Sequence, residues 1–227
     1  MVVIANPEIL KGYKWIESRN YGRAYSKGYY EPDVLRCLAH FLEKESIFFD
    51  IGGHAGYLSL YGSRLADKVY TFEPDKINFS FFKKIIHLNS VKNIFPFNVG
   101  IGSKEGKLFF QSGSTSSTGR VSDQGTIPID VISIDEFIEA NDISRLDVIK
   151  IDVEGFGAEV LKGMKMTLRK FRPVIFCEVH NIDEFDEVRK LVEFGYVFYT
   201  TDLIQIMLTD TTENQFLIAS PNGTFTI

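Results

Sequence analysis

The sequence contains few cysteines, and their spacing excludes two kinds of small structural scaffold. Cys37 and Cys177 are the two cysteines among 227 residues, and they lie far apart in the chain. Zinc sites use closely spaced cysteine and histidine pairs, and small secreted domains are held together by several disulfides. We therefore interpret both cysteines as reduced residues of a hydrophobic core.

A long apolar segment and an excess of basic charge are also missing. The apolar start of the chain reaches Asn6 and Pro7 too early for a signal peptide or a membrane span. The formal net charge is −5, whereas binding to nucleic acids or anionic membranes requires a basic surface. We predict a cytoplasmic protein with neither partner, and the sequence leaves its oligomeric state open.

Glycine motifs that bind phosphate are absent as well. Gly52, Gly53 and Gly56 follow an apolar stretch, but they form neither G-x-G-x-x-G nor the Gly-Lys-Ser/Thr of a P-loop. Asp50 stands beside them, and a carboxylate at this place disfavours a phosphate. We predict that residues 50–56 form a turn that binds a ligand with a cationic or hydroxyl-rich portion.

The chain does contain a series of apolar stretches that each end in an acid. Stretches without polar alternation are typical of strands that are buried on both faces of a sheet. Apolar residues at helical spacing separate them. The stretches are 47–51, 68–73, 147–152 and 172–178.

This alternation predicts an α/β fold with a doubly wound, mostly parallel, Rossmann-like sheet and an antiparallel edge strand. With 44% hydrophobic residues, the chain is expected to bury one full core. We assign residues 29–227 to this domain and residues 1–28 to a short helical N-terminal extension.

The acids at the ends of the apolar stretches are expected to meet at one edge of the sheet. Carboxyl ends of parallel strands lie together, and an open α/β sheet binds its ligand there. Glu73 follows the glycine turn by about twenty residues, where doubly wound folds bind ribose hydroxyls. Acids with glycines between them fit an adenosine-bearing cofactor that carries an amino acid. The four acids are Asp50, Glu73, Asp152 and Glu178.

Three segments together resemble the FkbM family of S-adenosylmethionine-dependent methyltransferases. They are Asp50-Ile-Gly-Gly-His-Ala-Gly56, Phe72-Glu73-Pro74 and Ile149-Lys-Ile-Asp152-Val-Glu154-Gly155. The resemblance runs from about residue 29 to about residue 180, and it departs from the family at Gly53-His54, where Ala-Asn is usual. It implies the seven-stranded class I methyltransferase fold, S-adenosylmethionine as cofactor, S-adenosylhomocysteine as product, and O-methylation of a sugar or secondary metabolite.

The resemblance also implies which residues bind the cofactor. Glu31 is a candidate for the methionine amino group, with a structural role at a helix start as an equal alternative. Asn98 and Val99 are expected at the adenine edge. The predicted cofactor-binding residues are Glu31, Asp50, Gly52, Gly53, His54, Gly56, Glu73, Pro74, Asn98, Val99 and Asp152.

Methyl transfer to a hydroxyl requires alignment of the two reactants and removal of a proton, but no covalent enzyme intermediate. Asp152, Glu154 and His180 are the candidate catalytic residues, because the strands before them would bring them to the substrate. His180 has the pKa suited to a base if it is unperturbed, and its alternative is a polar residue at a strand end. Asp152, Glu178 and His180 also match a divalent metal site, which we do not favour.

Two alternatives stay open from the sequence. Residues 112–125 are small and polar, and they are interpreted either as a substrate lid in which Arg120 contacts an anion or as a disordered hairpin tip. The protein itself is interpreted as an active enzyme with a small-molecule or glycan acceptor, or as a degenerate member that only binds. An NAD-dependent oxidoreductase is disfavoured by the missing G-x-G-x-x-G.

Overall fold

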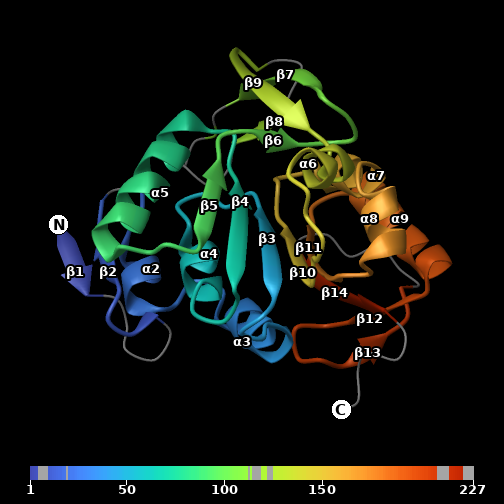
Figure 1. Cartoon of the computed structure of the whole chain (residues 1–227), viewed down its shortest axis with the longest axis horizontal. Coiled ribbons are helices and arrows are strands. Elements are labelled where there is room, and N and C mark those ends of the chain that lie inside the picture. Colours follow the sequence, from blue (N-terminus) through green and yellow to red (C-terminus); the bar gives the residue numbers. More distant parts are fainter. Residues whose placement is uncertain are drawn as a thin grey trace.

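The computed structural model describes residues 1–4, 10–18, 20–111, 113, 119–121, 125–208 and 215–221. Its centre is a sheet of eight strands in the order β13-β12-β14-β11-β10-β3-β4-β5 (Figure 1). Every residue of β3 is buried, which agrees with a strand that is covered on both faces. The strands are β3 (Ile47–Ile51), β4 (Lys68–Phe72), β5 (Ile94–Phe97), β10 (Val148–Ile151), β11 (Val174–Val179), β12 (Tyr196–Tyr199), β13 (Gln205–Ile206) and β14 (Gln215–Pro221).

The predicted mostly parallel sheet with an antiparallel edge is confirmed. β5, β4, β3, β10 and β11 run parallel to one another, and the short edge strand β13 is antiparallel to β12. The structure adds that β14 is inserted between β11 and β12 and runs antiparallel to both. The strand β13, with two residues, brings the number of strands to eight instead of seven.

Helices cover both faces of the sheet and give three layers (Figure 1). Side chains of successive strand residues point to opposite faces, so Phe48 packs in one hydrophobic cluster and Phe49 in the other. None of the described helices is long and apolar enough to cross a membrane. On the Phe48 side lie α3 (Pro32–Phe41), α4 (Tyr57–Gly62) and α5 (Lys76–Asn89); on the Phe49 side lie α6 (Ile134–Ala140), α7 (Gly157–Lys162), α8 (Lys165–Lys170), α9 (Ile182–Arg189) and the 3-10 helix η1 (Lys190–Phe194).

The N-terminal extension is packed against the Phe48 side of the domain. It contains the antiparallel pair β1 (Val2–Ile4) and β2 (Lys14–Ile16) and the helix α2 (Arg23–Lys27). Trp15 is fully buried in the same cluster as Phe48. The prediction of helical pieces is met by α2, whereas the two strands were not predicted; the domain boundary at residue 28 stays a prediction.

A second, smaller sheet lies beside the main one, at the top of Figure 1. Its strands, in the order β6-β9-β7-β8, are β6 (Gly100–Ile101), β9 (Ile127–Ile132), β7 (Gly106–Gln111) and β8 (Arg120–Val121). Phe110, Ile129 and Val131 form its own hydrophobic cluster. The strands β7 and β9 thus belong to a sheet that is separate from the main one. The predicted lid at 112–125 lies mostly outside the described residues.

Candidate functional site

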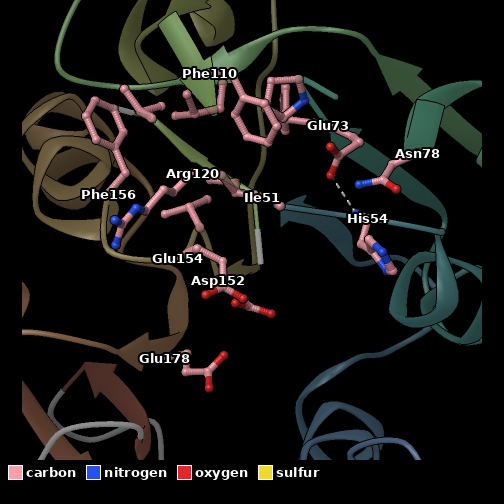
Figure 2. Close-up of a pocket in the computed structure, with 18 of the residues that line it drawn as sticks. Ile51, His54, Glu73, Asn78, Phe110, Arg120, Asp152, Glu154, Phe156 and Glu178 are labelled. Atoms are coloured by element: carbon pink, nitrogen blue, oxygen red, sulfur yellow. Dashed lines mark hydrogen bonds between the residues drawn. The ribbon is translucent and has the colours of Figure 1, made fainter. Parts of the chain in front are cut away.

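A cavity of about 210 Å³ lies where β3, β4, β10 and β11 end, and residues of the small sheet also line it (Figure 2). This is the edge at which parallel sheets bind ligands. The lining is rich in acids, and it brings together residues that are far apart in the sequence. The acids are Glu31, Glu73, Asp152, Glu154 and Glu178.

The glycine turn after β3 is shaped by close packing. Gly52 has φ +79°, and a Cβ there would lie 1.8 Å from the carbonyl oxygen of Asp152. Gly56 has φ +81°, and its Cβ would lie 1.9 Å from the ring of Phe82. A larger residue at either position would displace the backbone or the core. Gly52 lines the cavity, whereas Gly53 and Gly56 support the turn from outside the lining.

Glu73 is held by backbone donors at the end of β4. Its Oε2 accepts a hydrogen bond of 2.8 Å from the backbone N–H of His54, and its Oε1 accepts one of 2.8 Å from Asp75. Burial is the main cause that raises the pKa of this carboxyl to about 7. The carboxyl lines the cavity, so its remaining lone pairs can accept hydrogen bonds from a ligand.

Asn98 and Val99, the residues predicted at the adenine edge, follow the strand β5. The Asn98 side chain donates hydrogen bonds to the carbonyl oxygens of Glu73 (2.8 Å) and Pro74 (3.0 Å). Asn98 therefore fixes the corner after β4, and Val99 packs against the core cluster. Pro74 lines the cavity, whereas neither Asn98 nor Val99 belongs to the described lining.

His54 connects the glycine turn to the N-terminal extension. Its Nδ1 lies 3.3 Å from the hydroxyl of Tyr25, and its ring is tilted against Tyr21 at 5.4 Å. The residue has φ +48°, which histidine adopts more readily than most side chains. It also lines the cavity. This placement fits the predicted role of shaping the turn or touching the cofactor.

Asp50 lies below the cavity. Its side chain is fully buried, and it accepts a hydrogen bond from Ser59. Its other oxygen lies 3.5 Å from the ammonium of Lys150, its register neighbour on β10. Asp50 is not part of the described lining, and its contacts with Ser59 and Lys150 make it a support of the turn. Its predicted role in cofactor binding stays a prediction.

Lys150 is the residue that sequence reasoning missed. It is 2% exposed, donates a hydrogen bond of 3.0 Å to the carbonyl oxygen of Gly52, and lies 3.1 Å from Asp152. The lysine thus connects the glycine turn with the acid at the end of β10. A signal was present in the sequence, because a cation between Ile149 and Ile151 in a buried strand requires a charged partner.

Asp152 and Glu178 form an acidic pair at the centre of the site. Both line the cavity and are hydrogen-bonded to each other. The adjacent cation of Lys150 holds the pKa of Asp152 below its ordinary value, against the effect of burial. Burial and the negative charge of Asp152 raise the pKa of Glu178 to about 8. These opposite shifts in pKa favour protonation of Glu178 over protonation of Asp152.

Glu31 joins this pair from the start of α3. It has φ +44°, and its Oε2 is buried without a hydrogen bond among the described residues. Burial raises its pKa to about 7. An unsatisfied buried carboxylate oxygen is costly, and a cationic ligand group in the cavity would remove that penalty.

His180 lies next to Glu178 and is not part of the described lining of the cavity. Its Nε2 is 3.6 Å from Glu178 and 3.9 Å from Glu154, and its Nδ1 is 3.5 Å from Glu184. The Glu184 carboxylate is the largest influence that raises the pKa of His180 to about 9. Since this pKa favours the protonated imidazole at neutral pH, His180 is a poor base there. Of the two candidate bases Glu154 and His180, Glu154 is the one that lines the cavity.

The donor atoms of Asp152, Glu178 and His180 lie within 4.8 Å of one another and could hold a metal ion. Metal ligands must be deprotonated, so a metal ion would have to displace the protons that the raised pKa values of His180 and Glu178 favour. Lys150 already neutralises Asp152. The charges agree with our preference for a site without metal, which stays a prediction.

The protonated state of His180 predicts how stability depends on pH. The folded state raises the pKa from 6.5 to about 9, so this contribution is complete below pH 6.5 and is lost as the pH rises towards 9. We expect the free energy of unfolding, measured with urea, to fall more in the wild type than in His180→Gln between pH 6.5 and 9. Parallel pH profiles of the two proteins would contradict the assignment.

Comparison with known proteins gives consistent matches. A family model described as the methyltransferase FkbM domain matches residues 50–198. The hexuronic acid methyltransferase AglP of Haloferax volcanii is 32% identical over 169 residues, which cover 72% of this chain and 68% of that protein. A methyltransferase FkbM structure from Methylobacillus flagellatus has a TM-score of 0.53 at 19% identity and covers 77% of this chain and 43% of the other. A putative methyltransferase from Streptococcus mutans in complex with SAH has a TM-score of 0.52 at 16% identity. The match covers 82% of this chain and 93% of the other.

Proposed function

Because this chain belongs to the FkbM family of methyltransferases, we propose that it transfers a methyl group from S-adenosylmethionine to a hydroxyl of a sugar or secondary metabolite. The observation that carries the proposal is the acid-lined cavity beside the glycine turn, at the carboxyl ends of β3, β4, β10 and β11. An NAD-dependent oxidoreductase has no support, since the family is one of methyltransferases.

The cavity fits both ends of this cofactor. Glu73 is placed to accept hydrogen bonds from ribose hydroxyls, and the glycine turn allows close approach of a ligand to the backbone. Glu31 and Asp152 are placed to bind the ammonium of the methionine portion, which would satisfy the buried Oε2 of Glu31. The cofactor supplies the electrophilic methyl group of a sulfonium.

The residues of the chain then align the acceptor and take up its proton. Asp152 is the ionised carboxylate in the cavity that can accept a hydrogen bond from the acceptor hydroxyl. The neighbouring Glu178 has a raised pKa, which favours its protonated form. The ammonium of Lys150 holds the Asp152 carboxylate in place. When the oxygen of the acceptor hydroxyl is methylated, the proton of this hydroxyl passes to the Asp152 carboxylate. Alignment supplies much of the acceleration.

A cluster of aromatic side chains beside the cavity favours an enzyme that excludes water from its site. Tyr30 lines the cavity and packs on Tyr25 at 4.6 Å. Tyr25 in turn packs against Trp15 and Tyr57. Exclusion of water strengthens the electrostatic interactions in a site. A degenerate binding module stays the alternative, and formation of S-adenosylhomocysteine with an acceptor distinguishes the two.

Isothermal titration with S-adenosylmethionine, S-adenosylhomocysteine and NAD tests the cofactor. We expect both sulfur nucleotides to bind and NAD not to bind. S-adenosylmethionine should bind more tightly at pH 8 than at pH 6, by up to about tenfold for each of Glu31 and Glu73, because the ionised fraction of a carboxyl with a pKa of about 7 rises about tenfold over this range. Binding of NAD alone, or no binding, would refute the proposal.

A further inference from the structure

The cavity contains one strong cation among many acids. Arg120 is the one arginine or lysine among the described residues of the lining. It belongs to β8, where it pairs in register with Gln111 of β7, so the small sheet brings it to the site. The cofactor needs the acids for its cationic groups, but its ribose and adenine give no reason for an arginine.

Arg120 lies on the opposite side of Asp152 from the predicted ribose site. In the view of Figure 2, Arg120, Phe156 and Glu154 are drawn on one side of the cavity and Glu73 and His54 on the other, with Asp152 between the two groups. A cofactor that extends from Glu73 to Asp152 therefore leaves the Arg120 end for the acceptor. Phe156 also lines that end and offers an apolar surface to a sugar ring.

The guanidinium of Arg120 is available to bind a ligand. Ion pairs of arginine in the described part of the chain involve Arg36, Arg145 and Arg189, and none of them involves Arg120. The side chain is exposed. An acid-rich cavity repels an anionic acceptor, and a guanidinium at the acceptor end would overcome that repulsion with paired hydrogen bonds to a carboxylate.

We propose that Arg120 binds a carboxylate of the methyl acceptor, so that the acceptor is an acidic sugar of the uronic acid class. This inference rests on the proposed function, whose acceptor it specifies. Arg120 acts as the specificity-determining residue, while the hydroxyl to be methylated lies against Asp152. A carboxylate has one other source at this site, the methionine portion of the cofactor, and the experiment separates the two.

The test uses the full chain saturated with S-adenosylhomocysteine and titrates it with phenyl β-glucuronide and phenyl β-glucoside, which differ only at the carboxylate. We expect the wild type to bind the glucuronide at least tenfold more tightly. Arg120→Gln should remove this preference, an effect of about 10- to 100-fold on the glucuronide Kd, and Arg120→Lys should keep part of it. S-adenosylhomocysteine affinity should stay the same in all variants.

Lys107→Gln is the matched control, because Lys107 lies on β7 of the same sheet, is exposed and lies outside the cavity lining. It removes the same charge and should change neither Kd. Equal binding of the two glycosides by the wild type, including no binding of either, would overturn the proposal. Weaker binding of S-adenosylhomocysteine to Arg120→Gln would assign the arginine to the cofactor. Failure of the proposed function itself would appear earlier, as no binding of S-adenosylhomocysteine to the wild type.

Discussion

Asp152→Asn is expected to lower kcat by about 10²- to 10⁴-fold, the range typical of a lost proton acceptor. Asparagine keeps the shape of the side chain but cannot take up the proton of the acceptor hydroxyl. Asp152 is the carboxylate whose ionised form is favoured by Lys150 at 3.1 Å.

The measurement is the rate of S-adenosylhomocysteine formation at saturating cofactor and acceptor. Asp67→Asn is the control, since Asp67 is exposed and lies outside the cavity, and it should leave kcat unchanged. Calorimetry should show that Asp152→Asn still binds S-adenosylhomocysteine, more weakly if the carboxylate contacts the ammonium. A kcat within about threefold of the wild type would remove Asp152 from the proton transfer.

Lys150→Met is expected to have the largest effect on stability, lowering the free energy of unfolding by about 3–5 kcal/mol. Methionine fills a similar volume, but it leaves Asp50 fully buried with Ser59 as its hydrogen-bond donor and without a cation. An unpaired buried charge is the reason for so large a loss. The carbonyl oxygen of Gly52 also loses its donor, so the glycine turn should loosen.

Urea denaturation of Lys150→Met, Asp50→Asn and the double variant measures this interaction. We expect the double variant to be more stable than the sum of the two single losses predicts, because it no longer leaves the buried charge of Asp50 without a cation. If Lys150→Met does not fold, Asp50→Asn still tests the pair through its own loss of stability. Additive effects, or a loss below about 1 kcal/mol for Lys150→Met, would show that the ion pair is not important.

The sequence predicted the positions of the central strands well, because each strand is an apolar stretch of clear length. β3 and β10 are fully buried, β4 and β11 are largely buried, and all four end near an acid, a local signal that does not depend on the rest of the fold. It also placed four acids at one edge. Three of them, Glu73, Asp152 and Glu178, line the cavity.

The predictions that need long-range information were less complete. Whether Asp50 faces the cavity or the covering helix depends on which face of β3 it occupies, and an apolar strand without alternation gives no indication. Ser59 on α4 and Lys150 on β10 decide this in the structure. The small sheet, which brings Arg120 to the site, likewise depends on pairing between β7, β8 and β9.

β14 is the last described strand of the chain, yet it lies between β11 and β12. Both neighbours leave the ribosome before it during synthesis. Until residues 215–221 emerge, each neighbour therefore presents an edge of unpaired backbone groups, and such edges pair readily with other chains. A ribosome that pauses before residue 215 would hold a nascent chain prone to aggregation, because this half of the sheet closes only after residues 215–221 have emerged.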